Sequence, residues 1–357
     1  MHPLHKYSAM GDRPVRVGVL GASGYSGGEV VRLLLGHPGV RIGFIGGRDS
    51  AGRTLADVHP HLAGARVGSL RVHPVEEVND VDVVLSALPN GSCAGLAPTL
   101  LERGIRLIDL SGDHRLSASA YPVWYGFEHP APAWLDKAVY GLPELFRDQI
   151  RGAALVANPG CFPTPVVLGL VPLLRERLIE AAGIVVDGKT GLSGAGRGAG
   201  GRAAFAVTQE SVRPYRFPRH QHTPEMERAL ELGTGIRASV SFVPHLVPAV
   251  RGVLVTAYAR AGRDVTPGSP VDALASAYED EPFVRVLPPG EMTDAKRVRG
   301  SNVVELQAAL DGRTGTVVVV GTVDNLVKGA AGQAIQNLNL MAGFDETTAL
   351  PTVGMYP

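Results

Sequence analysis

Apolar runs rich in valine, isoleucine and leucine recur along the first half of the chain, and each is typical of a buried parallel β-strand. The first run, residues 15–20, is followed by a stretch at 27–36 whose valines and leucines have the spacing of one helix face. Further strands are expected at 40–45, 81–88 and 106–111. Because strands and helices alternate from the start, this part is expected to form a doubly wound α/β domain.

After residue 160 the pattern changes, because strand-like runs become more frequent and helical runs rarer. Strands are expected at 184–187, 238–243, 252–259, 302–307 and 316–320, and helices at 164–178, 223–232 and 270–279. This mixture predicts an α+β domain with a mixed, largely antiparallel sheet. A last segment, 326–342, has helical spacing again and is expected to return to the first domain.

Length and charge narrow the class of protein. The chain has 357 residues, enough for two domains, with 34 basic and 34 acidic side chains. This balance argues against binding to nucleic acid or to an acidic membrane. No apolar run reaches the length of a membrane helix, and the first residues lack the apolar core of a secretory signal, so a cytoplasmic protein is expected.

A glycine-rich turn joins the first strand to the first helix with the spacing GxxGxxG. Such a turn lets the backbone approach a pyrophosphate, and the helix N-terminus offers N–H groups to the anion. A tight turn without a ligand is the alternative, but the position between strand and helix favours a dinucleotide. The turn consists of Gly21, Ala22, Ser23, Gly24, Tyr25, Ser26 and Gly27.

The end of the second strand bears on the choice between NAD and NADP. Arg48 stands first after the Gly46-Gly47 pair, followed by Asp49 and Ser50, and Arg53 lies close behind. Cationic side chains here suit the 2′-phosphate of NADP, whereas an acidic residue suits NAD. A solvated loop without a ligand is the other interpretation.

The segment 158–164 (NPGCFPT) carries the strongest chemical signal. The Pro-Gly pair predicts a turn, and a helix is expected from residue 164, so Cys161 should lie at a helix N-terminus where the dipole favours the thiolate. The alternative is a small core residue. Cys93 lacks such a helix-opening turn and is expected to be structural, and no disulfide is expected between the two cysteines.

A nucleophilic cysteine needs a general base, and histidine is the usual one. His220 and His222 precede Thr223-Pro224-Glu225, which predicts a helix with its N-cap at Thr223 and places both histidines on the entering loop. A metal pair and a surface loop without a role are the alternatives. Spacing provides no third ligand, so no metal is predicted.

Residues 189–202 form a loop in which six of the eleven residues from 191 to 201 are glycine. Successive N–H groups of such a loop can surround an anion, with Arg197 and Arg202 adding charge. A mobile glycine linker is the alternative.

Taken together, these motifs resemble the N-acetyl-gamma-glutamyl-phosphate reductase family of arginine biosynthesis. The similarity extends from Gly21 to Gly343, and the combination of blocks is specific although no single one is. The blocks are GASGYSG (21–27), DLSGDHRL (109–116), YGLPEL (140–145), NPGCFPT (158–164), SGAGR (193–197), HQHTPE (220–225) and DNLVKGAAGQAIQNLN (324–339). The sequence departs from the usual family pattern at Pro165, at His114, where phenylalanine is common, and at Gln221, where arginine is frequent.

The resemblance implies an NADP(H)-binding Rossmann domain at 1–157 and 325–357 and a catalytic and oligomerisation domain at 158–324, in a homodimer or homotetramer. It makes Cys161 the nucleophile and His220 or His222 the acid/base, with His220 favoured. It also implies that Ser193, Gly194 and Arg197 face the substrate phosphate or carboxylate, and that Asn325 lies near the nicotinamide.

The implied reaction is the NADPH-dependent reduction of N-acetylglutamyl phosphate through a thioester on Cys161. The same chemistry on N-acetyl-aminoadipyl phosphate in lysine biosynthesis is an alternative, since one methylene changes affinity by only about 1–3 kcal/mol. A non-catalytic NADP-binding redox regulator is a second alternative. It leaves the histidines and the glycine-rich loop without a function.

Overall fold

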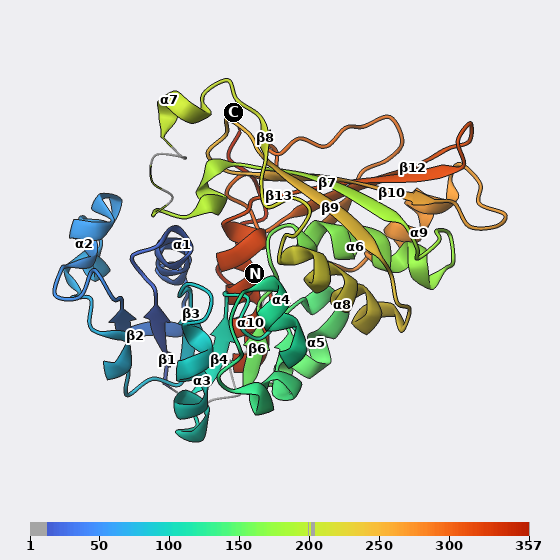
Figure 1. Ribbon diagram of the computed structural model, residues 1–357. Helices are drawn as coiled ribbons and strands as arrows, with labels where there is room; N and C mark the ends of the chain where they lie inside the picture. The colour runs from blue at the N-terminus through green and yellow to red at the C-terminus, as the bar shows by residue number, and fades with distance from the viewer. Residues whose placement is uncertain (1–12, 199, 201–203, 357) are drawn as a thin grey trace, which may run out of the picture. The chain divides into compact units, whose positions relative to one another are not determined.

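Two compact units make up the computed structural model, which describes residues 13–198, 200 and 204–356 (Figure 1). The first unit contains the residues up to Ala118, Glu128–Asn158 and Ala331–Leu350, and the second contains Ser119–Phe127, Pro159–Ala330 and the residues from Pro351 onward. The chain passes from the first unit to the second after Asn158, one residue from the predicted domain boundary. The units differ from the predicted domains at 119–127, 325–330 and 351–357, which belong to the second unit.

A six-stranded sheet forms the centre of the first unit. Its strands are β1 (Val15–Leu20), β2 (Val40–Gly46), β3 (Val83–Ser86), β4 (Arg106–Asp109), β5 (Val139–Tyr140) and β6 (Leu155–Ala157). They pair in the order β2-β1-β3-β4-β6-β5, and every pairing is parallel. The chain leaves β1 toward β2 on one side and continues at β3 on the other. Ligands bind at such a switch point, outside the carboxyl ends of the strands.

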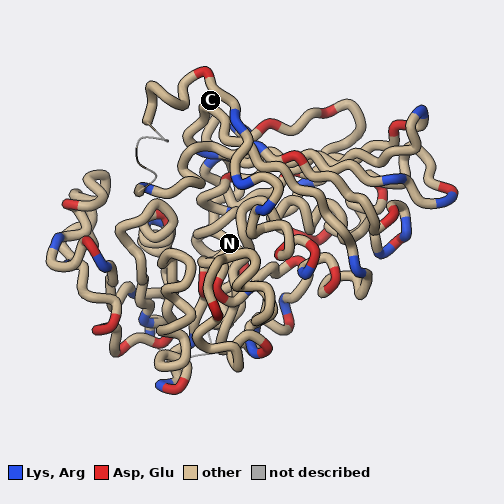
Figure 2. Tube along the Cα trace, in the orientation of Figure 1, with Lys and Arg blue, Asp and Glu red and all other residues tan. Residues whose placement is uncertain are grey.

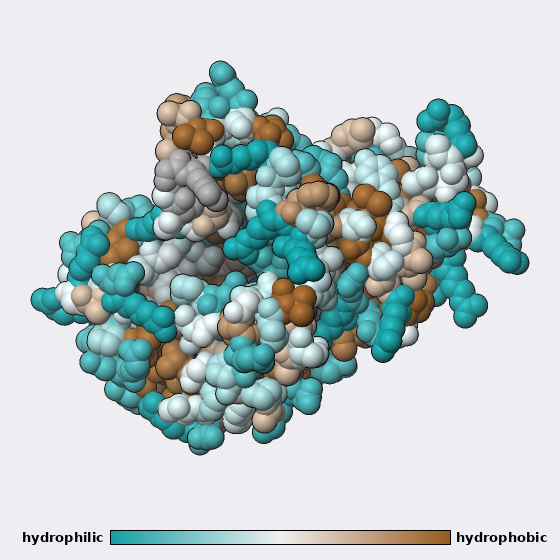
Figure 3. Space-filling model, in the orientation of Figure 1, coloured by the Kyte–Doolittle hydropathy of each residue, from teal (hydrophilic) through white to brown (hydrophobic). Residues whose placement is uncertain are grey.

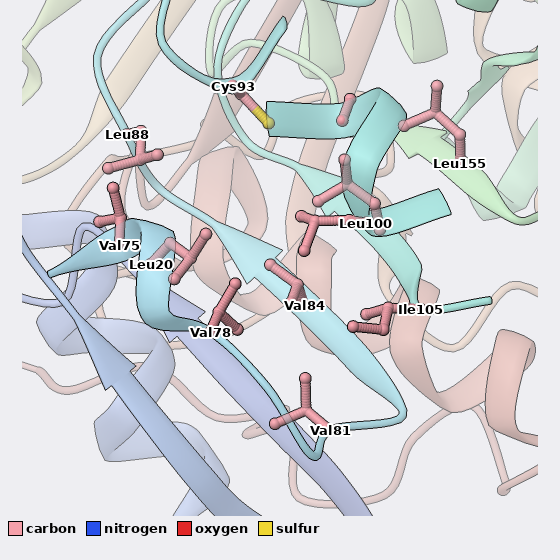
Figure 4. Close-up of a cluster of buried hydrophobic side chains, with 12 residues drawn as sticks. Leu20, Val75, Val78, Val81, Val84, Leu88, Cys93, Leu100, Ile105 and Leu155 are labelled. Carbon is pink, nitrogen blue, oxygen red and sulfur yellow. The ribbon is translucent and has the colours of Figure 1, made fainter. Parts of the chain in front are cut away.

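Helices on both faces bury this sheet. They are α1 (Tyr25–Leu34), α3 (Cys93–Glu102), α5 (Pro143–Arg151) and α10 (Gly332–Ala342). The short helix α2 (Leu55–Val58) packs against the turns that follow it. Helix α10 is buried along its whole length and packs against α1, α5 and β4, in agreement with the expectation for 326–342. Figure 4 shows the core under α3, where Leu100 and Cys93 lie with Leu20 and Val84 of the sheet.

The second unit is built on a seven-stranded mixed sheet. Its strands are β7 (Ile184–Thr190), β8 (Arg213–Pro214), β9 (Val240–Leu246), β10 (Val253–Arg260), β11 (Val284–Val286), β12 (Val304–Asp311) and β13 (Thr316–Val323). Their order is β11-β12-β13-β10-β7-β9-β8, with parallel pairs only at β11–β12 and β7–β9 in this sheet of described residues. The predicted fold class, a Rossmann domain plus a mixed, largely antiparallel sheet, is confirmed.

One face of this second sheet is covered by α6 (Pro163–Arg175), α8 (His222–Thr234) and α9 (Ser269–Ala277). Along β10 buried and exposed side chains alternate, because successive side chains of a strand point to opposite faces. Two short helices complete the unit, α4 (Tyr121–Trp124) and α7 (Phe205–Thr208). Phe205 of α7 is exposed, and apolar side chains are visible at this helix in Figure 3.

None of the helices in the described part of the chain combines the length and the apolar character that crossing a membrane requires. Acidic and basic residues are interspersed along the trace in Figure 2, as the balanced composition predicts.

Candidate active site

Cys161 lies two residues before the first residue of α6, and its side chain is partly exposed. Phe162 is the N-cap of this helix and Pro163 its first residue, where a missing N–H has no cost. The prediction that the cysteine stands at a helix N-terminus is confirmed. The positive end of the helix dipole therefore favours the thiolate form of Cys161.

The turn before the cysteine is held by α8. The buried carboxylate of Glu225 accepts a hydrogen bond of 2.7 Å from the N–H of Gly160. The imidazole of His222 lies against the same glycine, since a Cβ at position 160 would stand 2.4 Å from His222 Nε2. Only glycine fits there, and Glu225 and His222 together fix the backbone that carries the nucleophile.

Helix α8 begins at His222, not after Thr223, so the predicted N-cap is wrong. The hydroxyl of Thr223 makes no hydrogen bond within the part of the chain that the structure describes. Instead, His220 Nδ1 accepts a hydrogen bond of 3.1 Å from the N–H of His222, so a histidine ring satisfies an N–H at the start of the helix. His220 thus stays on the loop, as predicted, whereas His222 belongs to the helix.

This hydrogen bond fixes the tautomer of His220. A nitrogen that accepts an N–H carries no proton, so the proton of the neutral ring is on Nε2. The ring is 2% exposed and lies among aromatic rings, with centroid distances of 5.4 Å to Tyr215, 5.3 Å to Phe242 and 4.7 Å to His222. Burial, together with the charges of His222 and Arg216, lowers the pKa of His220 to about 2, so the resting ring is neutral.

Tyr215 is a site residue that sequence reasoning missed. Its ring packs edge-on against His220, and burial, followed by the charge of Cys161, raises the pKa of its hydroxyl. It therefore lies beside both the nucleophile and the candidate acid/base, with a hydroxyl that remains a hydrogen-bond donor. The sequence feature that could have suggested Tyr215 as a site residue is its position five residues before His220. Glu225 was also missed as a site residue, although its spacing of three from His222 places both on one helix face.

The loop after β7 is tied to the segment after β13. Asn325 donates a hydrogen bond of 2.9 Å to the hydroxyl of Ser193, and its carbonyl accepts the N–H of Gly252 at 2.8 Å. Asn325 is thus a brace for the predicted anion loop. Ser193 is buried, whereas Gly194 and Arg197 are exposed. Ala199 and residues 201–203, which include Arg202, lie outside the described residues.

The segment after β13 also reaches the nucleophile. Asp324 is buried and accepts the N–H groups of Gly300 at 2.7 Å and Leu326 at 2.8 Å. The following π-helical turn, Val327–Ala331, brings Gly329 so close that a Cβ there would lie 2.8 Å from the Cβ of Cys161. A side chain at position 329 would therefore collide with Cys161, and glycine there keeps the backbone close to the nucleophile.

In the first unit, the predicted dinucleotide turn has the backbone that such a turn needs. Gly21 has φ +74°, and a Cβ on it would lie 2.4 Å from the carbonyl oxygen of Ala87. A Cβ on Gly27 would lie 2.3 Å from the oxygen of Gly21. Gly24 is the N-cap of α1, whose first turn contains no acidic residue, so the positive end of this helix is available to an anion.

The end of β2 fits the adenosine ribose and its phosphate. A Cβ on Gly47 would stand 2.4 Å from Ser50 Oγ and 3.6 Å from Ser23 Oγ, so both hydroxyls border one small space. Ser50 is buried, and its hydroxyl has no hydrogen-bond partner among the described residues. Arg48, two residues earlier in the chain, is exposed. A partnerless buried hydroxyl, a space that a side chain would fill and a cation two residues before the hydroxyl together match a phosphorylated ribose.

Comparison with known proteins agrees with this arrangement. The family model described as semialdehyde dehydrogenase, NAD binding domain, matches residues 16–153, and the one described as semialdehyde dehydrogenase, dimerisation domain, matches residues 161–325. N-acetyl-gamma-glutamyl-phosphate reductase of Magnetococcus marinus is 46% identical over 349 residues, covering 97% of this chain and 99% of that protein. The reductase of the same name from Brevibacillus brevis is 44% identical, covering 96% and 100%. The chain belongs to the N-acetyl-gamma-glutamyl-phosphate reductase family.

Solved structures similar to this family member share its fold at low sequence identity. Aspartate semialdehyde dehydrogenase II of Vibrio cholerae, in complex with ASA, superposes with a TM-score of 0.71 at 18% identity, covering 93% of this chain and 99% of that one. The aspartate semialdehyde dehydrogenase of Candida albicans with NADP has a TM-score of 0.67 at 17% identity, covering 92% and 98%. These structures confirm the fold. The reductase relatives confirm the resemblance predicted from sequence motifs, and the family model of an NAD binding domain confirms the use of a nicotinamide cofactor.

Cys93 differs from Cys161 although it too begins a helix, α3, contrary to the expectation that no helix opens there. It is buried, and burial, followed by the charge of Asp109, raises the pKa of its thiol well above the ordinary value. A thiol in this state is a poor nucleophile. Within this reductase family member, Cys161 is thus the better candidate for the reacting sulfur.

Proposed function

We propose that this protein reduces N-acetyl-L-glutamyl 5-phosphate to N-acetyl-L-glutamate 5-semialdehyde in arginine biosynthesis, releasing phosphate and using NADPH. The observation that carries the proposal is the cysteine turn. Cys161 stands partly exposed at the start of α6, with its backbone fixed by Glu225 and with His220 on the adjoining loop. The identity of 46% to a reductase of this name supports the choice of substrate.

In the first half of the reaction, the thiolate of Cys161 attacks the acyl carbon of the substrate. A carbon–sulfur bond forms, and the carbon–oxygen bond to phosphate breaks with its electron pair leaving on phosphate. The product on the enzyme is a thioester at Cys161. Separation of acyl transfer from reduction replaces one high barrier with two moderate ones.

Bound NADPH supplies the hydride that reduces the thioester. We assign its pyrophosphate to the turn at 21–27 and its 2′-phosphate to Arg48, Ser50 and Ser23. The support is the steric fit of the glycines, the buried hydroxyl of Ser50, which lacks a partner among the described residues, and the exposed Arg48 two positions before it. We assign Asn325 to the nicotinamide end and Ser193, Gly194 and Arg197 to the anionic groups of the substrate.

We assign the proton transfer of the second half-reaction to His220. Reduction of the thioester places negative charge on the former carbonyl oxygen, and Nε2–H of His220 is the group that donates toward it. An isolated imidazolium is disfavoured by burial, but a neighbouring thiolate or oxyanion reverses this preference by Coulomb attraction. The proton that Cys161 loses when its thiolate forms supplies this imidazolium, whose Nδ1 then releases the N–H of His222, and donation to the oxyanion returns the ring to its neutral form. The same ring accepts the proton again when the aldehyde leaves and the carbon–sulfur bond breaks. His222 positions the Gly160 backbone.

The reverse reaction tests the proposal directly. N-acetylglutamate semialdehyde and phosphate should reduce NADP⁺ in the presence of the protein, and the rate should fall to the background when phosphate is omitted. The semialdehyde from aminoadipate, one methylene longer, should give a kcat/KM lower by about 10- to 200-fold. A higher value for the longer substrate would assign the enzyme to the lysine pathway, and no phosphate-dependent reaction with either would point to the non-catalytic regulator.

Arg48→Ala should weaken the preference for NADPH over NADH. Loss of a charge-assisted hydrogen bond costs about 1.5–3 kcal/mol, or roughly 10- to 150-fold, and the exposed position of Arg48 favours the lower end. The ratio of KM values for the two cofactors measures the effect. Arg53→Ala is the matched control, since Arg53 donates to the carbonyl of Asp57 and should leave the ratio unchanged. Equal effects of the two variants would remove Arg48 from the phosphate site.

We further propose that the protein is a homodimer or homotetramer that associates through the face of the second sheet opposite α6. Tyr258 and Val185, paired across β10 and β7, are 42% and 45% exposed there. Tyr258→Asp should lower the mass measured by analytical ultracentrifugation to that of a single chain. Leu232→Asp, on the exposed side of α8, is the control that should not. A wild-type protein that sediments as a single chain would contradict the proposal.

A cytoplasmic location completes the proposal. Both cysteines are free, and a reducing compartment keeps the sulfur of Cys161 available as a thiolate.

A further inference from the structure

Three side chains of metal-binding type that the proposed reaction does not use converge in the first unit. Cys93 begins α3, Asp109 ends β4, and His114 lies on the loop that follows. One ligand atom from each lies within 4.8 Å of the others, and all three residues are buried. Spacing along the sequence does not reveal this group, because the sheet brings its members together.

The parallel strands explain the convergence. Ser86 at the end of β3 pairs in register with Asp109 at the end of β4, so their side chains leave the same edge of the sheet. Asp113 fixes the start of α3 from outside, since its carboxylate accepts the N–H groups of Gly91, Cys93 and Ala94 at 2.6–3.0 Å. These backbone bonds occupy Asp113, so it is not counted among the ligands.

One hydrogen-bonding atom of the cluster has no partner among the described residues. His114 Nδ1 lies 2.7 Å from Asp109 Oδ2, but Nε2 of the same ring has no hydrogen-bond partner among the described residues. The thiol of Cys93 interacts with the side chains of Ser86 and Asp109. The arginine that follows, Arg115, donates to the backbone carbonyls of Asn158 and Leu110. A carboxylate, a thiol and an imidazole thus lie together in a buried part of the first unit.

We propose that Cys93, Asp109 and His114 bind one divalent cation of the zinc type, with Ser86 beside the fourth coordination position. Thiolate and imidazole ligands select zinc over magnesium or calcium. The thiolate and the carboxylate carry two negative charges, which a divalent cation neutralises, so the buried complex is neutral. Binding releases the thiol proton to solvent, and no atom changes its oxidation state.

The geometry requires only a small adjustment. Zinc bonds of about 2.0–2.3 Å place tetrahedral ligands roughly 3.3–3.7 Å apart. The hydrogen-bonded pair of His114 and Asp109 therefore separates by less than about 1 Å when the metal replaces the shared proton. The ligands come from a helix start, a strand end and the loop that follows this strand, which makes the site structural. It ties the segment 87–94 to β4, and the carbonyl of Ala87 in this segment packs against the cofactor turn at Gly21.

Cobalt substitution tests the site with a readout independent of activity. The full chain carrying Cys161→Ser is freed of metal with a chelator and titrated with Co²⁺, so that Cys93 is the only remaining thiol. We expect one Co²⁺ per chain with a thiolate-to-cobalt charge-transfer band and the visible bands of a tetrahedral ion. Adding Cys93→Ala should abolish the charge-transfer band. His114→Phe, which keeps a ring in the buried space, should weaken binding by about a hundredfold or more.

Competition with Zn²⁺ should remove the cobalt spectrum and raise the melting temperature of the protein, and neither effect should occur in the His114→Phe variant. Circular dichroism and NADPH binding establish that each variant is folded. A folded Cys161→Ser protein that shows no charge-transfer band would overturn the proposal and leave a proton-sharing pair of Asp109 and His114. An unchanged stoichiometry and affinity in His114→Phe would overturn it equally, and this variant decides the question if Cys93→Ala does not fold.

Discussion

Cys161→Ser should lower kcat by roughly 10⁴- to 10⁶-fold, the range seen when an enzyme loses its covalent nucleophile. Serine has nearly the same size, so the turn held by Glu225 and His222 should be unchanged. The hydroxyl cannot ionise near neutral pH, whereas the dipole of α6 favours the thiolate of Cys161. Because the proposed cofactor site is built from other residues, NADPH should bind the variant with wild-type affinity in a fluorescence titration.

Mass spectrometry provides the complementary measurement. Wild-type protein incubated with substrate but without NADPH should accumulate an acyl group on the peptide that contains Cys161, because no hydride donor is then available to reduce the thioester. Cys93 is 1% exposed and serves as the internal control, which should remain unmodified by substrate and by iodoacetamide. Wild-type turnover in Cys161→Ser, or acylation of Cys93 in its place, would contradict covalent catalysis at Cys161.

The elements that the sequence predicts well are those with long apolar runs. β1, β7, β10 and β13 appear where β-branched residues cluster, and α1 and α6 appear where apolar residues have helical spacing, with ends that shift by one to three residues. Burial on one or both faces dictates these patterns, so the pattern reports the environment directly.

Short elements escape prediction for the same reason. β5 has two residues and β6 has three, too few for any periodicity, and the neighbouring strands of the sheet hold them in place. The start of α3 at Cys93 depends on hydrogen bonds to Asp113, twenty residues later in the sequence, and the residues near Cys93 do not predict it. Local sequence reports local preference, whereas these elements exist through tertiary contacts.

The candidate site likewise combines features that the local sequence predicts and features that exist only through tertiary contacts. Cys161 was predictable because the Pro-Gly turn and the helix start lie beside it in the sequence. The brace between Asn325 and Ser193 spans 132 positions, and the hydrogen bond between Glu225 and Gly160 spans 65. Residue types at such separations give no signal of contact, so the role of Glu225 in holding the nucleophile emerges only in three dimensions.

Replacing each of the two histidines by asparagine should lower kcat to clearly different extents. His220→Asn should lower kcat by about 10²- to 10⁴-fold, the usual contribution of a general acid/base. Asparagine is suited to this test because its side-chain oxygen can still accept the N–H of His222, so the start of α8 is preserved. His222→Asn should have a smaller effect on kcat, because we assign the ring of His222 to the support of Gly160 and the proton transfer to His220.

The rate of Cys161 alkylation by iodoacetamide distinguishes the two roles independently of turnover. A ring that only transfers protons to the substrate oxygen leaves the placement of the sulfur unchanged, so His220→Asn should be alkylated at nearly the wild-type rate while its kcat is low. Loss of the ring that packs on Gly160 loosens the turn, so His222→Asn should show an altered alkylation rate with a moderate loss of kcat. If instead His222→Asn has the larger loss of kcat and an unchanged alkylation rate, the proton transfer belongs to His222, and the tautomer fixed by the N–H of residue 222 serves only the helix.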